Sequence, residues 1–282
     1  MKIFRIILLV ASMLSITHSF SQSNISINDP RNGGLWAKGN ITKTSVTITP
    51  QGDYFYYDLE LEFTSGKIST AKESYDSLEI SCNFNLPSGS FIKSASLLIN
   101  NEWVDAKLMP RKEAHAIYEG LVKRRIDPLI IYKNYGDNYL FKIFPLNPQS
   151  SRTMKMTYAI SSNSLNGNKS AGLPMDIVKA SETPVDLKVS IKKSTDFPNP
   201  QFVGLTNVNF KESENGEYLE AVIPASSTIS NIISSKESSS TQFSSSKNQN
   251  DITYKFSFKA TDEFTLEDPK KYLFIVYYFY FV

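Results

Sequence analysis

Apolar and polar side chains alternate along residues 54–63 of this chain. One side of the stretch carries Phe55, Tyr57, Leu59, Leu61 and Phe63, and the other carries Asp58, Glu60 and Glu62. Alternation with a period of two is typical of a strand that buries one face of an antiparallel sheet. The pattern recurs at 45–49, 78–84 and 153–160. These four stretches predict a sheet-rich domain.

A single helix is predicted from Arg111 to Arg124, after Pro110, because proline suits the first position of a helix. Its apolar residues are spaced three and four apart and should form one stripe facing the sheet: Ala114, Ile117, Tyr118, Leu121 and Val122. His115 falls opposite that stripe, so we expect it at the surface. The basic triplet Lys123-Arg124-Arg125 could be a binding patch. We interpret it instead as a solvated helix end, where cations meet the negative end of the helix dipole.

Two hairpins are predicted on either side of this helix. Asn100 and Asn101 separate two apolar segments within 97–104, and asparagine tolerates the positive φ that a tight hairpin turn needs. The second hairpin has its loop at 134–138, which contains Asn, Gly and Asp between two apolar runs. Both turns join neighbouring strands, which again favours an antiparallel sheet.

Further strand signals follow a linker that is rich in Ser, Asn and Gly at 161–172. They lie at 185–191, 218–223 and 252–258, and a Ser-rich stretch from Ser226 to Asn250 predicts a long loop between the last two. The whole pattern predicts a mainly β fold. We expect an antiparallel β-sandwich with one amphipathic α-helix, followed by further β-strands.

The first 21 residues predict a secretory signal peptide. Lys2 and Arg5 form a basic start, Ile6–Ile16 is an apolar run, and Ser19-Phe20-Ser21 is a small-x-small cleavage site before Gln22. The apolar run is too short to span a membrane. We therefore expect an exported protein, either secreted, periplasmic or on the cell surface, with no membrane span beyond the signal peptide.

Removing this leader leaves a chain without net charge. The full sequence has 30 basic and 28 acidic residues, and the leader holds two of the basic ones, so 28 of each sign remain. A nucleic-acid-binding protein usually carries a basic excess. We therefore expect no nucleic-acid partner.

Few residues offer catalytic or metal-binding chemistry. The only cysteine, Cys82, falls on an apolar strand face and should be a buried small hydrophobe, and a single cysteine excludes an internal disulfide. Of the two histidines, only His115 lies outside the leader. A single imidazole cannot build a histidine-based metal site or a catalytic triad with a second histidine, and no carboxylates have the spacing of a Ca²⁺ loop. We therefore expect no catalytic, cofactor or metal site.

Four residue runs in the middle of the chain carry a family resemblance. In order, they are Asn85-Leu86-Pro87-Ser88-Gly89-Ser90, Ala114-His115-Ala116-Ile117-Tyr118-Glu119, Asp127-Pro128-Leu129-Ile130, and Asn138-Tyr139-Leu140-Phe141-Lys142-Ile143-Phe144-Pro145-Leu146-Asn147-Pro148. Together they resemble the VIT domain, the module of vault proteins and inter-alpha-trypsin inhibitor heavy chains. The resemblance covers about Val46 to Tyr158 and implies an extracytoplasmic β-sandwich with one helix.

In that family, a von Willebrand A domain usually follows the VIT domain. Residues 271–276 resemble its first strand, but the chain continues with aromatic residues to Val282 where the family places an Asp-x-Ser-x-Ser metal motif. The resemblance therefore implies a chain truncated before the A domain, and it assigns no metal ligand here. The expected organisation is a signal peptide at 1–21, a VIT-like domain at 22–160, a linker at 161–182, a β-rich extension at 183–262 and the start of the missing domain at 263–282.

Three functional hypotheses follow from these features. The first is a non-enzymatic interaction or adhesion module that binds an unknown protein, surface or matrix partner. The second is a secreted hydrolase that uses exposed carboxylates such as Asp105, Asp127 or Asp137, although each has a simpler role in a turn or on a strand face. The third is anchoring to a membrane by Tyr272–Val282, which is shorter than the roughly 20 residues of a membrane span.

The aromatic tail yields the first prediction. Tyr272–Val282 has no charge, proline or glycine, so it forms strands readily and promotes self-association when unpaired. Deleting 271–282 should raise the soluble yield and leave the melting temperature of the remaining chain unchanged. Sedimentation and a thermal melt of both versions test this. Unfolding of the shortened chain would instead make the tail a native strand of the sandwich.

Overall fold

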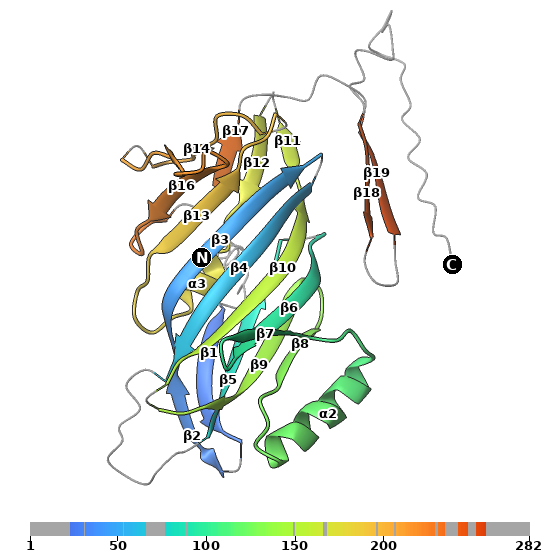
Figure 1. Cartoon of the computed structure of the whole chain (residues 1–282), viewed down its shortest axis with the longest axis vertical. Helices are drawn as coiled ribbons and strands as arrows, with labels where there is room; N and C mark the ends of the chain where they lie inside the picture. Colours follow the sequence, from blue (N-terminus) through green and yellow to red (C-terminus); the bar gives the residue numbers. More distant parts are fainter. Residues whose placement is uncertain are drawn as a thin grey trace, which may run out of the picture.

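Strand β4 (Tyr54–Thr64) runs through the middle of the largest sheet of the protein (Figure 1). Its side chains alternate between buried and half-buried, as the sequence pattern predicted. Tyr57 of β4 stands opposite Tyr158 of the neighbouring strand, and the two buried rings stack with centroids 4.9 Å apart and planes 8° apart. This strand therefore defines the inner face of the sheet.

The computed structural model describes residues 23–30, 32–52, 54–65, 77–87, 89–148, 150–165, 168–195, 197–205, 207–228, 231–234, 242–247 and 252–257. The expected signal peptide, the tail Tyr272–Val282 and parts of the loop Ser226–Asn250 lie outside these residues. The expectations for the leader and the tail stay predictions.

The largest sheet has eight strands in the order β15-β16-β13-β3-β4-β10-β6-β7. Besides β4, they are β3 (Asn40–Gln51), β6 (Phe91–Ile99), β7 (Glu102–Asp105), β10 (Arg152–Ser161), β13 (Leu187–Lys192), β15 (Lys211–Glu212) and β16 (Tyr218–Ile223). All neighbours pair antiparallel except β13 and β3, which are parallel. Asn100 and Asn101, both with positive φ, form the β6–β7 turn that the sequence predicted.

A five-stranded sheet in the order β2-β1-β5-β9-β8 covers one end of this inner face. Its strands are β1 (Asn24–Asp29), β2 (Asn32–Lys38), β5 (Leu78–Asn85), β8 (Leu129–Lys133) and β9 (Asn138–Leu146). Phe63 of β4 meets Phe141 of β9 across the sandwich, with ring centroids 5.4 Å apart. Cys82 is fully buried on β5, which confirms its predicted position in the core.

A four-stranded sheet in the order β11-β12-β17-β14 covers the other end of the inner face, and a short helix lies against β5 of the five-stranded sheet. They are β11 (Asn163–Leu165), β12 (Asn168–Gly172), β14 (Gln201–Phe202), β17 (Asn231–Ser234) and helix α3 (Met175–Lys179). Here Phe55 of β4 meets Phe197 edge-on, with centroids 4.9 Å apart. A single apolar cluster contains Phe63, Phe141, Phe55 and Phe197. The core is therefore continuous from the middle of the chain into the later strands.

Two segments contain more regular structure than the sequence indicated. The expected linker at 161–182 holds β11, β12 and α3, and the expected loop from Ser226 to Asn250 holds β17 and β18 (Gln242–Lys247). β18 pairs with β19 (Ile252–Ser257) in a separate two-stranded sheet. Residues 161–182 and β17 are polar in composition, but each contains a few deeply buried apolar residues, such as Ile177 and Ile232. These residues pack both segments onto the core.

Helix α2 (Arg111–Lys123) lies beside β8 on the outer side of the five-stranded sheet. Its anchor is Tyr118, which is 5% exposed and packs with Ile130 and Phe144 in a small cluster of its own. The Tyr118 hydroxyl donates a hydrogen bond to Glu79 Oε2 at 2.9 Å. Burial, followed by the Glu79 carboxylate, raises the pKa of Tyr118 far above its ordinary value, so this hydroxyl keeps its proton.

Glu79 connects four elements of the structure. This carboxylate on β5 is nearly buried, and besides Tyr118 of α2 it pairs with Lys142 Nζ of β9 at 2.8 Å. Asn28 Nδ2 of β1 adds a longer bond of 3.4 Å to Oε1. A buried carboxylate is tolerated when it is paired and hydrogen-bonded, so these three donors keep Glu79 in place and α2 on the sheet.

The helix is rotated relative to the expected stripe, which corrects two expectations. His115 is half-buried, with its ring 4.7 Å from the Tyr132 ring, whereas we expected it at the surface. Ile117 is 44% exposed, whereas we expected it to face the sheet. The bond from Tyr118 to Glu79 accounts for both, because it turns the Tyr118 side of the helix toward the sheet and moves Ile117 to the edge.

The observed architecture confirms the predicted fold class, a mainly β sandwich with one amphipathic helix and further strands. Among the described residues, no helix is both long and apolar enough to cross a membrane. The proposed domain boundaries stay a prediction. The strands on both sides of 161–182 share one sheet and one core.

The Glu79 connection generates a stability prediction. Tyr118→Phe keeps the ring but removes the hydroxyl that donates to a buried carboxylate, so it should lower the free energy of unfolding by about 1.5–3 kcal/mol. Tyr135→Phe is a matched control, because Tyr135 is 74% exposed. Loss of its hydroxyl should change the free energy of unfolding by less than about 0.5 kcal/mol. Urea unfolding measures both. Equal midpoints for the two variants would contradict the role of Glu79.

Cys82 generates a prediction about reactivity. Burial raises the pKa of its thiol, and the side chain has no exposed surface, so the reactive thiolate is neither formed nor accessible in the folded state. Ellman's reagent should leave the native protein unlabelled even at mildly alkaline pH and should label one thiol per chain in guanidinium. Stoichiometric labelling of the native protein would show that β5 opens readily.

Candidate functional site

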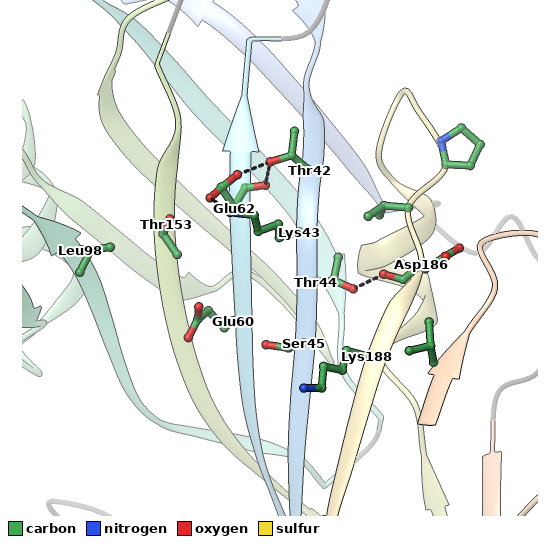
Figure 2. A pocket seen from close by; sticks show the side chains of 13 residues that line it. Thr42, Lys43, Thr44, Ser45, Glu60, Glu62, Leu98, Thr153, Asp186 and Lys188 are labelled. Carbon is green, nitrogen blue, oxygen red and sulfur yellow. Dashed lines mark hydrogen bonds and ion pairs between the residues drawn. The ribbon is translucent and has the colours of Figure 1, made fainter. Parts of the chain in front are cut away.

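A polar hollow of ≈ 760 Å³ lies on the outer face of the large sheet, over β3, β4 and the start of β13 (Figure 2). Its charged groups pair with one another or with near neighbours. Lys43 binds Glu62 at 3.2 Å, and the longer pairs are Lys155–Glu60 and Lys188–Glu220, both at 3.8 Å.

Glu62 is an example of a charged group in the hollow whose hydrogen-bond and ion-pair partners come from the sheet itself. Thr42 Oγ1 donates to its Oε1 at 2.6 Å, and this hydrogen bond, helped by Lys43, lowers the pKa of the Glu62 carboxyl (Figure 2). Thr44 Oγ1 donates to the carbonyl oxygen of Asp186 at 2.9 Å, across the parallel seam between β3 and β13. Such cross-strand contacts stabilise a sheet. The polar side chains of the hollow are therefore held in place by hydrogen bonds and ion pairs within the protein.

A second depression, the α2 groove, lies between helix α2, strand β8 and the first half of β6. The groove has a volume of ≈ 470 Å³. We define it by its lining, which includes residues 91–95, 106–109, the inner edge of α2 and 128–133. Its size is within the range of small-molecule sites. Leu108 and Ile117, which are 59% and 44% exposed, line it.

The connection from β7 to α2 forms one wall of the groove. The Ala106 amide donates to the Ala95 carbonyl at 2.8 Å, which extends the β6–β7 pairing by one step. The chain then leaves the sheet through Lys107, Leu108 and Met109 and enters α2. The wall is largely apolar because the Leu108 and Met109 side chains line the groove.

The lining of the α2 groove carries charge of one sign. It includes Lys93, Lys107, Arg111 and Lys133 and no aspartate or glutamate. The Arg111 guanidinium lies 4.3 Å from the centre of the Tyr132 ring, and Lys133 has a long ion pair of 3.9 Å with Asp137. The groove is therefore apolar in its walls and cationic at its margins, which suits an amphiphilic anionic ligand.

The three carboxylates of the hydrolase hypothesis have different partners. Asp105 accepts a hydrogen bond from Ser96 Oγ at 2.7 Å, and Asp127 pairs with Arg152 at 3.2 Å. Asp137 is in the β8–β9 loop near Lys133. The described residues contain no group of three or more His, Cys, Asp or Glu side chains arranged to hold a metal ion.

The basic triplet at the end of α2 is exposed, and Arg124 Nε donates to the Gly120 carbonyl at 3.2 Å. This bond satisfies one of the free carbonyls at a helix C-terminus. It agrees with our interpretation of a solvated helix end.

The sequence did not reveal the α2 groove. Its lining comes from four separate segments, and only the fold brings Lys93 close to Lys133. A signal did exist in the apolar pair Leu108-Met109, which precedes Pro110 in a segment with no strand or helix periodicity. Apolar residues in such a connection indicate either a core contact or an exposed surface.

Solved structures of similar shape have very different sequences. A putative nutrient binding protein from Legionella pneumophila has a TM-score of 0.40 and 11% identity, over 76% of this chain and 72% of that one. An M1 zinc metallopeptidase from Deinococcus radiodurans has a TM-score of 0.38 and 9% identity, over 77% of this chain and 46% of that one. Aminopeptidase A of Legionella pneumophila has a TM-score of 0.39 and 9% identity, over 78% and 23% respectively.

No curated protein matches this chain. Residues 41–158 match the family model described as Vault protein inter-alpha-trypsin domain, which confirms the resemblance drawn from the four residue runs. The matched segment runs from the start of β3 into β10, and it contains helix α2 and the whole lining of the α2 groove. The chain therefore carries a Vault protein inter-alpha-trypsin (VIT) domain, formed by residues 41–158.

Proposed function

We propose that this protein is a non-enzymatic interaction and adhesion module that acts outside the cytoplasm, and that it binds a protein partner through the face around α2. One observation carries the proposal. Of the eight large apolar side chains that are exposed among the described residues, five lie between residues 103 and 126: Trp103, Val104, Leu108, Ile117 and Ile126. This stretch contains β7, the connection to α2 and the helix itself.

Exposed apolar groups that gather on one surface are typical of an interaction site. Isolated ones are common on any protein, but here Leu108 and Ile117 line the same groove. Trp103 is exposed on the outer face of the large sheet, beside the polar hollow, with Lys155 4.4 Å from its ring. Aromatic residues, methionine and arginine are enriched in protein-binding surfaces, and the groove lining contains Met109 and Arg111.

The place of action is part of the proposal. The leader-like residues 1–21 and the presence of a VIT domain support export, to the medium, the periplasm or the cell surface. The partner is then another exported or surface-exposed protein or a matrix component.

The test compares partner capture by the full chain and by two double variants. Leu108→Glu with Ile117→Glu places charge in the α2 groove, whereas Val203→Glu with Val222→Glu places the same charges at equally exposed sites elsewhere. Secreted and surface proteins of the source cells are captured on the immobilised chain. Partners bound by the wild type should bind the groove variant at least about tenfold more weakly, since a buried unpaired charge is costly, and should bind the control variant normally.

Two results would overturn this proposal. Equal capture by all three proteins would remove the α2 face as the contact surface. Hydrolysis of ester, peptide or glycoside substrates that is lost in Asp105→Asn, Asp127→Asn or Asp137→Asn would favour the secreted hydrolase instead.

A further inference from the structure

We propose that the α2 groove binds an extended peptide of alternating apolar and acidic residues, which adds as a strand to the free edge of β8. This inference rests on the proposed function and names the chemical class of its partner. It depends on three observations: an open strand edge, apolar walls, and cations without acidic neighbours in the lining.

Strand β8 is the last strand of its sheet, with β9 on one side and no strand on the other among the described residues. Two hydrogen bonds fix which backbone groups face β9. The Phe144 amide donates to the Pro128 carbonyl at 3.2 Å, and the Asn134 amide donates to the Asn138 carbonyl at 2.9 Å. In an antiparallel ladder, this orientation alternates along the strand. The even-numbered residues of β8 therefore bond to β9, and the backbone groups of Leu129, Ile131 and Lys133 point to the open edge.

The side chains of β8 pack on the two faces of the sheet. Ile130 and Tyr132 pack toward α2, whereas Leu129 and Ile131 pack against the main core. Only the edge is left open, and residues 128–133 line the groove, so the edge opens into it. An unpaired strand edge is a ready template for another extended chain, and strand addition is a common mode of peptide recognition.

The walls and margins of the groove define the side chains of such a peptide. Across from β8, Leu108, Ile117 and Leu121 offer apolar contacts for every second residue. The residues between them would lie near Lys93 and Lys107. Lys93 Nζ lies 5.4 Å from the centre of the Tyr56 ring, and the groove lining has no acidic side chain to compete for either lysine. Acidic residues at these positions complement the charge.

Hydrogen exchange on the full chain tests the edge itself. In the free protein, the amide protons of Leu129, Ile131 and Lys133 should exchange faster than those of Ile130 and Tyr132, which bond to β9. The probe is an acetylated peptide of about seven residues that alternates valine and glutamate. Its binding should protect the three odd-numbered amides and leave the even-numbered ones unchanged. Exchange that shows no such alternation, with or without peptide, would overturn the proposal.

Affinity measurements by fluorescence polarisation test the chemistry. Binding should fall at least about tenfold when the peptide is N-methylated at every second residue, because the backbone bonds are lost. Ile131→Pro removes one outward amide and should act similarly, since proline is tolerated on a free edge. Lys93→Glu with Lys107→Glu should also weaken binding, whereas Lys112→Glu, outside the groove lining, should not. Binding should weaken as salt is raised.

The outcomes separate strand addition from other occupants. A peptide that binds equally well after N-methylation, or oleate that binds when the peptide does not, would overturn strand addition in favour of an apolar anion site. Peptide-independent dimers that are lost in Ile131→Pro would assign the edge to a second copy. If captured partners are lost in the Leu108→Glu/Ile117→Glu variant but neither the peptide nor Ile131→Pro affects them, the proposed function stands and this inference fails.

Discussion

The buried face of β4 is the constraint on which the rest of the structure depends. This one strand carries Phe63 at the end that meets the five-stranded sheet and Phe55 at the end that meets Phe197. Between them, the stacked rings of Tyr57 and Tyr158 occupy the centre of the core. A large buried ring makes many contacts that no other arrangement of the strand would preserve. Both covering layers are therefore fixed relative to the same strand.

The α2 groove follows from how the helix is held. The helix has a small cluster of its own, apart from the main core, and Glu79 links it to β5, β9 and β1. Because Tyr118 determines its rotation, one apolar edge of the helix remains outside the core. That edge, the Leu108 segment and the unpaired strand β8 line one groove. The surface best suited to binding is thus a consequence of attaching the helix through a single buried polar contact.

The sequence allowed most of the central sheet to be predicted, for physical reasons. Strands such as 54–63 are half-buried, so their alternation reports their structure directly, and the Asn100-Asn101 turn is recognisable because few residues tolerate positive φ. Polar composition concealed β12 and β17, whose contribution to the core rests on isolated residues such as Ile232. The exposed position of Ile117 could not be predicted either, because periodicity gives a stripe but not the polar contact that sets its orientation.

The parallel pairing of β3 with β13 has a consequence for the order in which the chain can fold. β3 is synthesised early, and its neighbour on that side, Leu187–Lys192, appears only after the whole matched VIT segment has been made. At ordinary rates of translation, this delay is on the order of ten seconds. A contact so distant along the chain forms slowly, since a long loop must close first. During that interval the β3 edge is unpaired on this side, and the nascent chain is exposed to mispairing there.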